Sequence, residues 1–402
     1  MPSICLCFQV HQPLRLRNYS FFDINNDHDY FDDDSNRLIL NKVAEKCYLP
    51  ANEIMLKHIN TYKGEFKIAF SITGVLLDQL ERYNMKVLDS FKRMADTGCV
   101  EFLNETYYHS LAFLFSKKDF KEQVRMHKEK IKKLFGQTAK TFRNTEMIYN
   151  NELAKEVETL GYRVILTEGA DQVLGWRSPN YAYQPIGCLK LKCLLKNYRL
   201  SDDIAFRFSN QNWAEYPLTS EKYAGWLHEI NSAGEVINLF MDYETFGEHQ
   251  WEETGIFRFL DSLPEQILTH SDFEFLTPIE VAKKYQPVAQ LDVPRFISWA
   301  DVERDLTAWI GNHMQNDAIE TLYSMEKKIR KENNDSLLNL WRLLQSSDHF
   351  YYMCTKWHAD GTVHKYFNPY RSPHDAYINY MNILADLSNT LDDIPQPKLV
   401  KV

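Results

Sequence analysis

The 402-residue sequence lacks the features that would place it among membrane or nucleic-acid-binding proteins. No eighteen apolar residues follow one another, so no segment has the length and hydrophobicity of a membrane-spanning helix. No long run of Lys or Arg occurs, and 55 acidic residues outnumber 46 basic ones, which gives a net charge of -9. Because proteins that bind nucleic acid carry basic surfaces, we expect neither a nucleic-acid partner nor a membrane.

The cysteines lack a pairing pattern. There are seven, an odd number, scattered along the chain without any C-x-x-C spacing, which argues against a disulfide framework and against a structural zinc site. The first residues, "MPSICLCFQVHQP", carry no basic segment before their short apolar run, so they do not resemble an export signal. We therefore expect a cytoplasmic protein without a metal or another cofactor, and the sequence leaves its oligomeric state open.

What the chain does contain is a large apolar and aromatic fraction. Hydrophobic residues make up 44% of the sequence, enough for one large domain and a smaller second one. Aromatic residues make up 14%, more than a core of this size usually needs. Aromatic rings stack on the apolar faces of sugars, but they also fill ordinary cores, so the surplus alone does not assign a ligand.

Short strand-like runs alternate with helical segments in the first three quarters of the chain. Strands that alternate with helices predict an α/β fold with a parallel sheet. Seven strands over about 290 residues, with polar residues gathered after the strand ends, favour an incomplete seven-stranded (β/α) barrel over two open sheets. The expected strands are 3–10, 65–73, 98–104, 139–146, 162–168, 236–244 and 273–278.

The remaining part of the chain predicts helices alone. Amphipathic runs follow "LDVPRFISWADVERD", so we expect a barrel over 1–290 and a helical C-terminal domain over 291–402 that completes the cleft. One helix of the barrel can be delimited closely, since Asn150 or Asn151 caps it and Gly161 ends it.

Carboxylates stand where two of the expected strands end. Glu146 closes the run "AKTFRNTE", and Asp242 follows "VINLFM". Two carboxylates on different strands of one barrel are the minimum machinery for cleaving a glycosidic bond. In that use Glu146 must stay ionised, helped by Arg143 and Asn144, whereas Asp242 needs a raised pKa. Glu244 adds a second negative charge near Asp242, and buried structural ion pairs remain the alternative interpretation.

Three further polar groups follow expected strands. His11 lies in "HQP" directly after the first strand. Glu101, Glu105 and His109 lie in "GCVEFLNETYYH", and Asp305 and Trp309 lie in "DVERDLTAWIGNHMQ". His109 and His249 are candidate ligands of a sugar hydroxyl, but a structural role fits each equally well. Trp213, in the polar stretch "NQNWAEYP", is a candidate platform for stacking a sugar ring.

The chain resembles glycoside hydrolase family 57, which contains α-amylases and other α-glucan-processing enzymes. The resemblance spans nearly the whole length and rests on five regions that occur in order, to which the stretch 364–387 adds a likeness to the amylase subgroup. These regions are "HQP" (11–13), "GCVEFLNETYYH" (98–109), "FRNTEMIYNN" (142–151), "MDYETFGEHQ" (241–250) and "DVERDLTAWIGNHMQ" (301–315).

The resemblance implies roles for the carboxylates and for several neighbours. Glu146 matches the family's nucleophile and Asp242 its general acid/base, while His11 matches a histidine that holds the sugar. Asp305 and Trp309 are expected to line subsites, and Glu101, His109, Glu244 and His249 are further substrate-binding candidates. Arg143 stands where some members carry Trp.

The implied function is that of a retaining α-amylase acting on α-1,4-linked glucans. In a retaining enzyme the two carboxyl groups are expected to lie roughly 5 to 5.5 Å apart. A 4-α-glucanotransferase or a branching enzyme would use the same pair, and a glycan-binding protein without activity is the alternative from another class. A metal-dependent deacetylase is disfavoured because no two of the thirteen histidines have H-x-x-x-H spacing. The acidic stretch 23–36 lacks the Gly of an EF-hand loop, so we interpret it as a surface loop rather than a calcium site.

Overall fold

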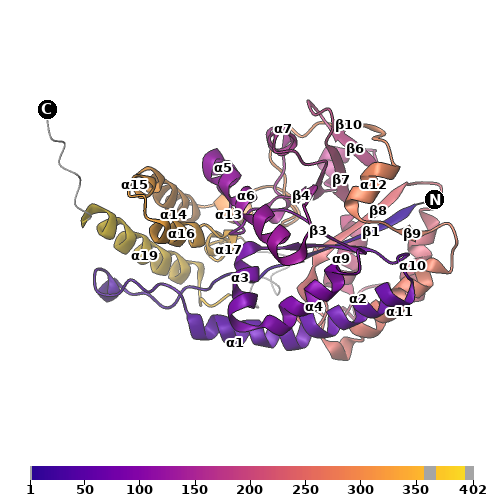
Figure 1. Cartoon of the computed structure of the whole chain (residues 1–402), viewed down its shortest axis with the longest axis horizontal. Coiled ribbons are helices and arrows are strands. Elements are labelled where there is room, and N and C mark those ends of the chain that lie inside the picture. The colour runs from indigo at the N-terminus through magenta and orange to yellow at the C-terminus, as the bar shows by residue number, and fades with distance from the viewer. Residues whose placement is uncertain (1, 357–367, 394–402) are drawn as a thin grey trace.

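The strands of the computed structural model form two five-stranded sheets (Figure 1). The structure describes residues 2–356 and 368–393. The first sheet is entirely parallel and contains β1 (Ser3–Val10), β2 (Ile68–Ile72), β3 (Val100–Phe102), β8 (Val236–Asp242) and β9 (Glu274–Phe275). The second contains β4 (Thr141–Arg143), β5 (Val164–Glu168), β6 (Ala182–Pro185), β7 (Lys192–Lys196) and β10 (Ala289–Leu291), and only β6 and β7 pair antiparallel.

Backbone hydrogen bonds join the two sheets at two places, between β3 and β4 and between β7 and β8. Asn104 follows β3, and its N–H donates to Thr141 of β4 at 2.9 Å, while its carbonyl accepts from Arg143 at 2.9 Å. On the other side Asn197, after β7, donates to Asn238 of β8 at 2.9 Å. The carboxyl ends of the parallel strands therefore meet around one common edge, where ligands of α/β proteins bind.

Strand β1 runs through the centre of this arrangement. All eight of its residues are buried, as the apolar sequence "SICLCFQV" requires of a parallel strand that is covered on both faces. It pairs with β8 from Ser3 to Gln9, and this register places Gln9 opposite Asp242. The register thus fixes the height at which the Asp242 carboxylate leaves the sheet.

The α/β class and the parallel strands are confirmed, but the predicted strands match only in part. Six of the seven predicted runs contain a strand of three or more residues, whereas 273–278 contributes only the two-residue β9. The strands β6, β7 and β10 were not predicted. In β7 the sequence "KCLLK" is short and has lysine at both ends, so it lacks the β-branched pattern that marks a strand.

Twelve helices accompany the strands before residue 290 in the described part of the chain. One of them, α7 (Asn151–Thr159), tests the prediction that Asn150 or Asn151 caps a helix. In α7 the Asn150 side chain accepts from the Leu153 N–H at 2.9 Å, so Asn150 rather than Asn151 is the cap, and Gly161 follows with a φ of +91°. These helices are α1 (Asp33–Val43), α2 (Leu49–Thr61), α3 (Gly74–Tyr83), α4 (Met85–Ala95), α5 (Ala112–Phe115), α6 (Lys117–Phe135), α7 (Asn151–Thr159), α8 (Asp171–Leu174), α9 (Tyr198–Asp202), α10 (Ser220–Glu229), α11 (Ile256–Leu268) and α12 (Pro278–Lys284).

Single helical turns of 3-10 or π type occur beside several of these elements. They are η1 (Phe21–Asp23), η2 (Ala44–Tyr48), η3 (Thr145–Met147), η4 (Asp203–Arg207), η5 (Tyr243–Thr245) and η6 (Glu252–Thr254). Two of them, η3 and η5, directly follow the strands β4 and β8 and carry Glu146 and Glu244.

Helices alone follow residue 306 in the described part, and they gather on one side of the sheets in Figure 1. Their core contains Trp309, Trp341 and Tyr380, but also Tyr19 and Tyr30 of the N-terminal loop. The helices are α13 (Thr307–Ile310), α14 (His313–Ser324), α15 (Glu326–Lys331), α16 (Asp335–Leu343), α17 (Ser347–Tyr351) and α19 (Pro373–Asp393). Residues 364–367 of the amylase-like stretch lie outside the described residues.

The acidic stretch 23–36 docks onto α19. The buried carboxylate of Asp386 accepts hydrogen bonds from the Asn25 N–H at 2.6 Å, from His28 Nδ1 at 2.7 Å and from the Tyr30 hydroxyl. Within the described ranges, no group of three or more possible metal ligands occurs in this stretch.

No helix in those ranges has the length and apolar character needed to cross a membrane.

Candidate active site

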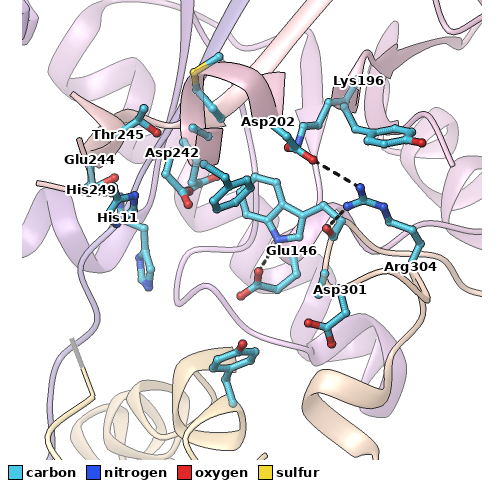
Figure 2. A pocket seen from close by; sticks show the side chains of 18 of the residues that line it. His11, Glu146, Lys196, Asp202, Asp242, Glu244, Thr245, His249, Asp301 and Arg304 are labelled. Carbon is cyan, nitrogen blue, oxygen red and sulfur yellow. Dashed lines mark hydrogen bonds and ion pairs between the residues drawn. The ribbon is translucent and has the colours of Figure 1, made fainter. Parts of the chain in front are cut away.

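A pocket of about 680 Å³ opens at the carboxyl ends of the strands, and Figure 2 shows it from close by. It is lined by residues from both sheets and from the C-terminal helices. Seven of the ten residues predicted for the site are among them, namely His11, His109, Glu146, Asp242, Glu244, His249 and Trp309. The pocket therefore brings together residues that lie up to about 300 positions apart in the sequence.

Glu146 lies directly after β4, in a strained turn. Its φ of +56° and that of Met147, +52°, fall in the left-handed region, which residues other than glycine adopt at a cost. The carboxylate is held at both oxygens: Trp299 Nε1 donates to Oε2 at 2.8 Å, and the Ser347 hydroxyl donates to Oε1 at 2.7 Å. The side chain is thus fixed in one orientation, with 14% of its surface exposed.

The surroundings of Glu146 favour its ionised form. Burial opposes ionisation, but hydrogen bonding by His109 and the positive charges of His109 and Arg143 outweigh it, so the pKa of Glu146 lies below its ordinary value. His109 Nε2 lies 3.3 Å from Glu146 Oε1. Glu146 therefore carries the negative charge that a nucleophile needs at neutral pH.

Asp242, at the end of β8, has the opposite tendency. Burial and the negative charge of Glu146 raise the pKa of Asp242 to about 6, against smaller opposing effects of Arg143, Lys196 and His109. Figure 2 shows the Asp242 and Glu146 side chains in the same pocket. Two carboxyl groups whose environments push their pKa values apart are suited to act as an acid and a nucleophile.

Glu244 lies deeper than Asp242 and is only 4% exposed. Its Oε1 accepts from the hydroxyl of Tyr48, a buried residue of η2, and from the His11 N–H at 3.3 Å. Burial and the charge of Asp242 raise the pKa of Glu244 to about 8. Since Glu244 is then protonated at neutral pH, it does not add a second fixed negative charge beside Asp242.

His11 and His109 stack with ring centroids 4.0 Å apart. His11 Nε2 lies 2.9 Å from Asp348 Oδ2, and Nδ1 lies 2.9 Å from the Thr73 hydroxyl. His11, His109 and Asp348 hold possible metal ligands within 4.8 Å of one another. The two rings, however, direct their nitrogens to separate carboxylates, His11 to Asp348 and His109 to Glu105 and Glu146, so the donors fit a hydrogen-bonded network better than a metal site.

Charged side chains form another wall of the pocket, which Figure 2 shows around Lys196 and Arg304. Lys196 Nζ lies 3.2 Å from Asp202, and Arg304 lies 3.6 Å from the same carboxylate. Both cations also face the buried Glu168, at 3.8 Å and 3.4 Å. This network holds the loop that carries Trp299, since Arg304 donates to the Trp299 carbonyl.

Three predicted site residues, Glu101, Trp213 and Asp305, do not line the pocket in the part of the chain that the structure describes. The Glu101 carboxylate accepts from the Thr141 hydroxyl and from the Ile279 N–H, so it ties β3 to its neighbours. Trp213 packs on Trp226 at 6.1 Å.

Asp305 accepts from the N–H of Thr307 at 2.8 Å and orders the start of α13. Each of these three side chains makes a local structural contact outside the pocket lining, and its binding of substrate stays a prediction. Trp309 differs: it lines the pocket, although it is only 2% exposed and its indole nitrogen is buried without a hydrogen-bond partner among the described residues.

The sequence analysis missed Trp299, Ser347 and Asp348, all of which contact predicted site residues. Ser347 and Asp348 lie in α17, inside "LQSSDHFYY", which was interpreted only as part of an amphipathic helix. The available signal was the run of five polar residues, 345–349, that interrupts the helical pattern. Their use in the site follows from the fold, because the Ser347 N–H donates to the His109 carbonyl at 2.9 Å.

The fold and the pocket define an α/β protein with a paired-carboxylate site. The family model for glycosyl hydrolase family 57 matches residues 5–294. A Methanocaldococcus jannaschii protein with alpha-amylase in its name is 46% identical over 404 residues, which cover 96% of this chain and 84% of that protein. The chain belongs to glycosyl hydrolase family 57.

More distant relatives share the fold. The 4-alpha-glucanotransferase of Thermococcus litoralis superposes with a TM-score of 0.70 at 17% identity, over 95% of this chain and 59% of that one. A family 57 branching enzyme of Thermococcus kodakaraensis superposes with a TM-score of 0.67 at 14% identity, over 98% and 92%. An alpha-amylase of Pyrococcus abyssi is 26% identical over 168 residues, and the match covers 42% of this chain and 22% of that longer protein.

Proposed function

We propose that the chain is a retaining glycoside hydrolase of the α-amylase type, which cleaves α-1,4 bonds in starch, glycogen or maltooligosaccharides. The observation that carries the proposal is the pair Glu146 and Asp242 in one pocket, with pKa values displaced in opposite directions. The name of the M. jannaschii relative supports the choice of an amylase.

In the proposed first step the ionised Glu146 attacks the anomeric carbon while Asp242 donates its proton to the leaving glycosidic oxygen. The C1–Oε bond forms as the C1–O bond to the departing sugar breaks. In the second step Asp242 accepts a proton from water, whose oxygen displaces Glu146, so the product keeps the α configuration. The separation of the two carboxyl groups, roughly 5 to 5.5 Å for a retaining enzyme, stays a prediction.

The other candidate site residues take binding roles in this proposal. His11, held by Asp348 and Thr73, contacts the sugar at the cleavage point, and Trp309 lines the pocket beside it. His109, Glu244 and His249 complete the wall of that subsite. No cofactor takes part in the proposed steps.

The second candidate is a 4-α-glucanotransferase or a branching enzyme, because solved structures with those names share the fold. These activities would use the same two carboxylates and differ only in whether water or a sugar hydroxyl reaches the glycosyl-enzyme. A glycan-binding protein without turnover is the alternative from another class.

Incubation with maltoheptaose, followed by chromatography of the products, tests these alternatives. Products shorter than seven units alone indicate hydrolysis, a ladder that extends above seven units indicates transfer, and an unchanged substrate contradicts an enzyme. Each result should be compared with the Glu146→Gln variant, which is expected to leave the substrate unchanged in every case.

The architecture proposed with this function joins both sheets into one incomplete seven-stranded barrel over 1–290, with a helical domain over 291–402 beside the cleft. The hydrogen bonds between β3 and β4 and between β7 and β8 support this description. The domain boundary and the cytoplasmic location inferred from the sequence remain predictions.

A further inference from the structure

A buried imidazole beside the proposed nucleophile faces a carboxylate at each of its two nitrogens. His109 Nδ1 lies 3.4 Å from Glu105 Oε2, and Nε2 lies 3.3 Å from Glu146 Oε1. A neutral imidazole carries one hydrogen and would direct a lone pair at one of these carboxylates, whereas an imidazolium donates to both. The position of the ring between two acceptors therefore favours its cationic form.

Glu105 does not line the pocket among the described residues, yet its charge is fixed by several donors. It is fully buried, and its Oε1 accepts from the Ser71 hydroxyl at 2.7 Å and from Gln9 Nε2 at 3.4 Å. Arg143 Nη1 lies 3.7 Å from Oε2. Burial opposes ionisation, but the hydrogen bond from His109 and the charges of Arg143 and His109 lower the pKa of Glu105 to about 2.

The other charged groups around His109 do not favour the cationic form of its ring. His11 stacks on the ring with centroids 4.0 Å apart, but its nitrogens are used by Thr73 and Asp348. Arg143 is a neighbouring cation that opposes the charge of His109, and burial opposes it as well. Against both effects, the hydrogen bonds to Glu105 and Glu146 raise the pKa of His109 to about 9.

The backbone adds a second, independent sign that this position is constrained. His109 adopts a φ of +51°, a left-handed conformation that a β-carbon disfavours. The Ser347 N–H of α17 stabilises this conformation, because it donates to the His109 carbonyl at 2.9 Å. Backbone strain of this kind persists only where the surrounding structure fixes a residue, and it is common at functional sites.

We propose that Glu105 is a positioning residue that keeps His109 as an imidazolium, and that this cation keeps the Glu146 nucleophile ionised and oriented. The proposal rests on the function proposed above, in which Glu146 attacks the sugar. Glu105 acts only through His109, so its removal should change the ionisation of the site rather than the affinity for substrate.

The charge of His109 can be measured without turnover. In the unmodified protein with ¹⁵N-labelled histidine, the signals of His109, assigned by their absence in His109→Gln, are expected to show both nitrogens protonated at pH 8. A neutral ring at pH 7 would overturn the proposal. Because this readout needs no substrate, it remains decisive even if maltoheptaose is not cleaved and the proposed function fails.

The Glu105→Gln variant tests the consequence for catalysis. Loss of the imidazolium should raise the pKa of Glu146, so the acid limb of kcat/KM on maltoheptaose should move up by about one to three pH units. We expect kcat to fall with KM little changed, and Glu105→Asp to restore part of the activity. The matched control is Glu280→Gln, a carboxylate of α12 paired with Lys67 away from the pocket, which should leave the pH profile unaltered. An acid limb that stays in place in Glu105→Gln contradicts the proposal.

Discussion

At the scale of single residues, the Asp242 carboxyl group predicts the pH dependence of the proposed reaction. Its pKa of about 6 is raised by burial and by the charge of Glu146, so the protonated acid is lost as the pH rises through that value. Because kcat/KM reports the free enzyme, it should decline above about pH 6 in a pH–rate profile with maltoheptaose. A profile that is flat up to pH 8 would contradict the assignment of the acid.

The Asp242→Asn variant tests the role of Asp242 by removing its carboxyl group. An amide can neither donate the proton to the leaving oxygen nor activate water, so kcat should fall by about 10²- to 10⁴-fold. The decline of kcat/KM above about pH 6 should disappear in this variant, because the carboxyl group that causes it has been replaced. Steady-state rates between pH 4 and pH 8 measure both effects, and a variant that retains the wild-type profile would exclude Asp242 as the acid.

At the scale of elements, the turn after β8 shapes the site through one glycine. Gly247 has a φ of +111°, and a β-carbon there would collide with the carbonyl oxygen of Lys46 in η2. Gly247→Ala should therefore displace the segment that carries Asp242, Glu244 and His249 and lower kcat/KM by at least about tenfold, the effect of some 1.4 kcal/mol in the barrier.

The matched control for this change is Gly225→Ala in α10. Apart from the adjoining residues and backbone of its own helix, no atom of the described residues lies within 4 Å of a β-carbon built at Gly225, and its φ is not in the left-handed region. Alanine inside a helix should leave activity unchanged and stabilise the fold by up to about 1 kcal/mol. Equal activity of the two variants would show that the turn does not position the site.

The contact of α6 with α15 and α16 depends on a buried anion. Asp119 is fully buried and accepts from Arg330 Nη2 and Arg342 Nε, each at 2.8 Å. Asp119→Ala leaves these cations short of a partner, so the free energy of unfolding should fall by about 3 kcal/mol in urea denaturation. The exposed pair of Arg125 and Glu129 on the same helix is the control, since Glu129→Gln should cost less than about 1 kcal/mol. Equal losses would contradict a structural role for Asp119.

How far the sequence predicts this molecule also differs between elements. The run "VINLFMD" predicts β8 and its terminal carboxylate, because a buried parallel strand is continuously apolar and a charge at its end needs a use. The strand β7 could not be predicted from "KCLLK", since its lysines contact a helix end and the pocket wall, neither of which is local in sequence. Asp305 was assigned to the site through the family resemblance, and Glu101 through its place in a polar stretch. The sequence could not show the local contacts that both carboxylates make, because those partners are fixed by the fold.

At the scale of the whole molecule, the site depends on helices that follow the last strand of the sheets in the sequence. Ser347 of α17 donates to Glu146 Oε1 at 2.7 Å, although the two residues lie 201 positions apart. A hydrogen bond to an ionised group contributes about 1.5 to 3 kcal/mol, so Ser347→Ala should lower kcat/KM by about tenfold or more. Ser336→Ala, at an exposed position of α16, is the control and should have no effect on the rate. A full rate in Ser347→Ala would show that the C-terminal helices do not serve catalysis.

The identity of the nucleophile is the claim on which this account depends, and covalent trapping tests it most directly. An activated α-glucosyl fluoride should glycosylate the Asp242→Asn variant faster than water releases the sugar, because the departing fluoride needs no acid while the second step lacks its base. Digestion and mass spectrometry should then find the hexose on the peptide that contains Glu146. A label on Glu244, or a first-formed product of β configuration without any labelled enzyme, would contradict the account.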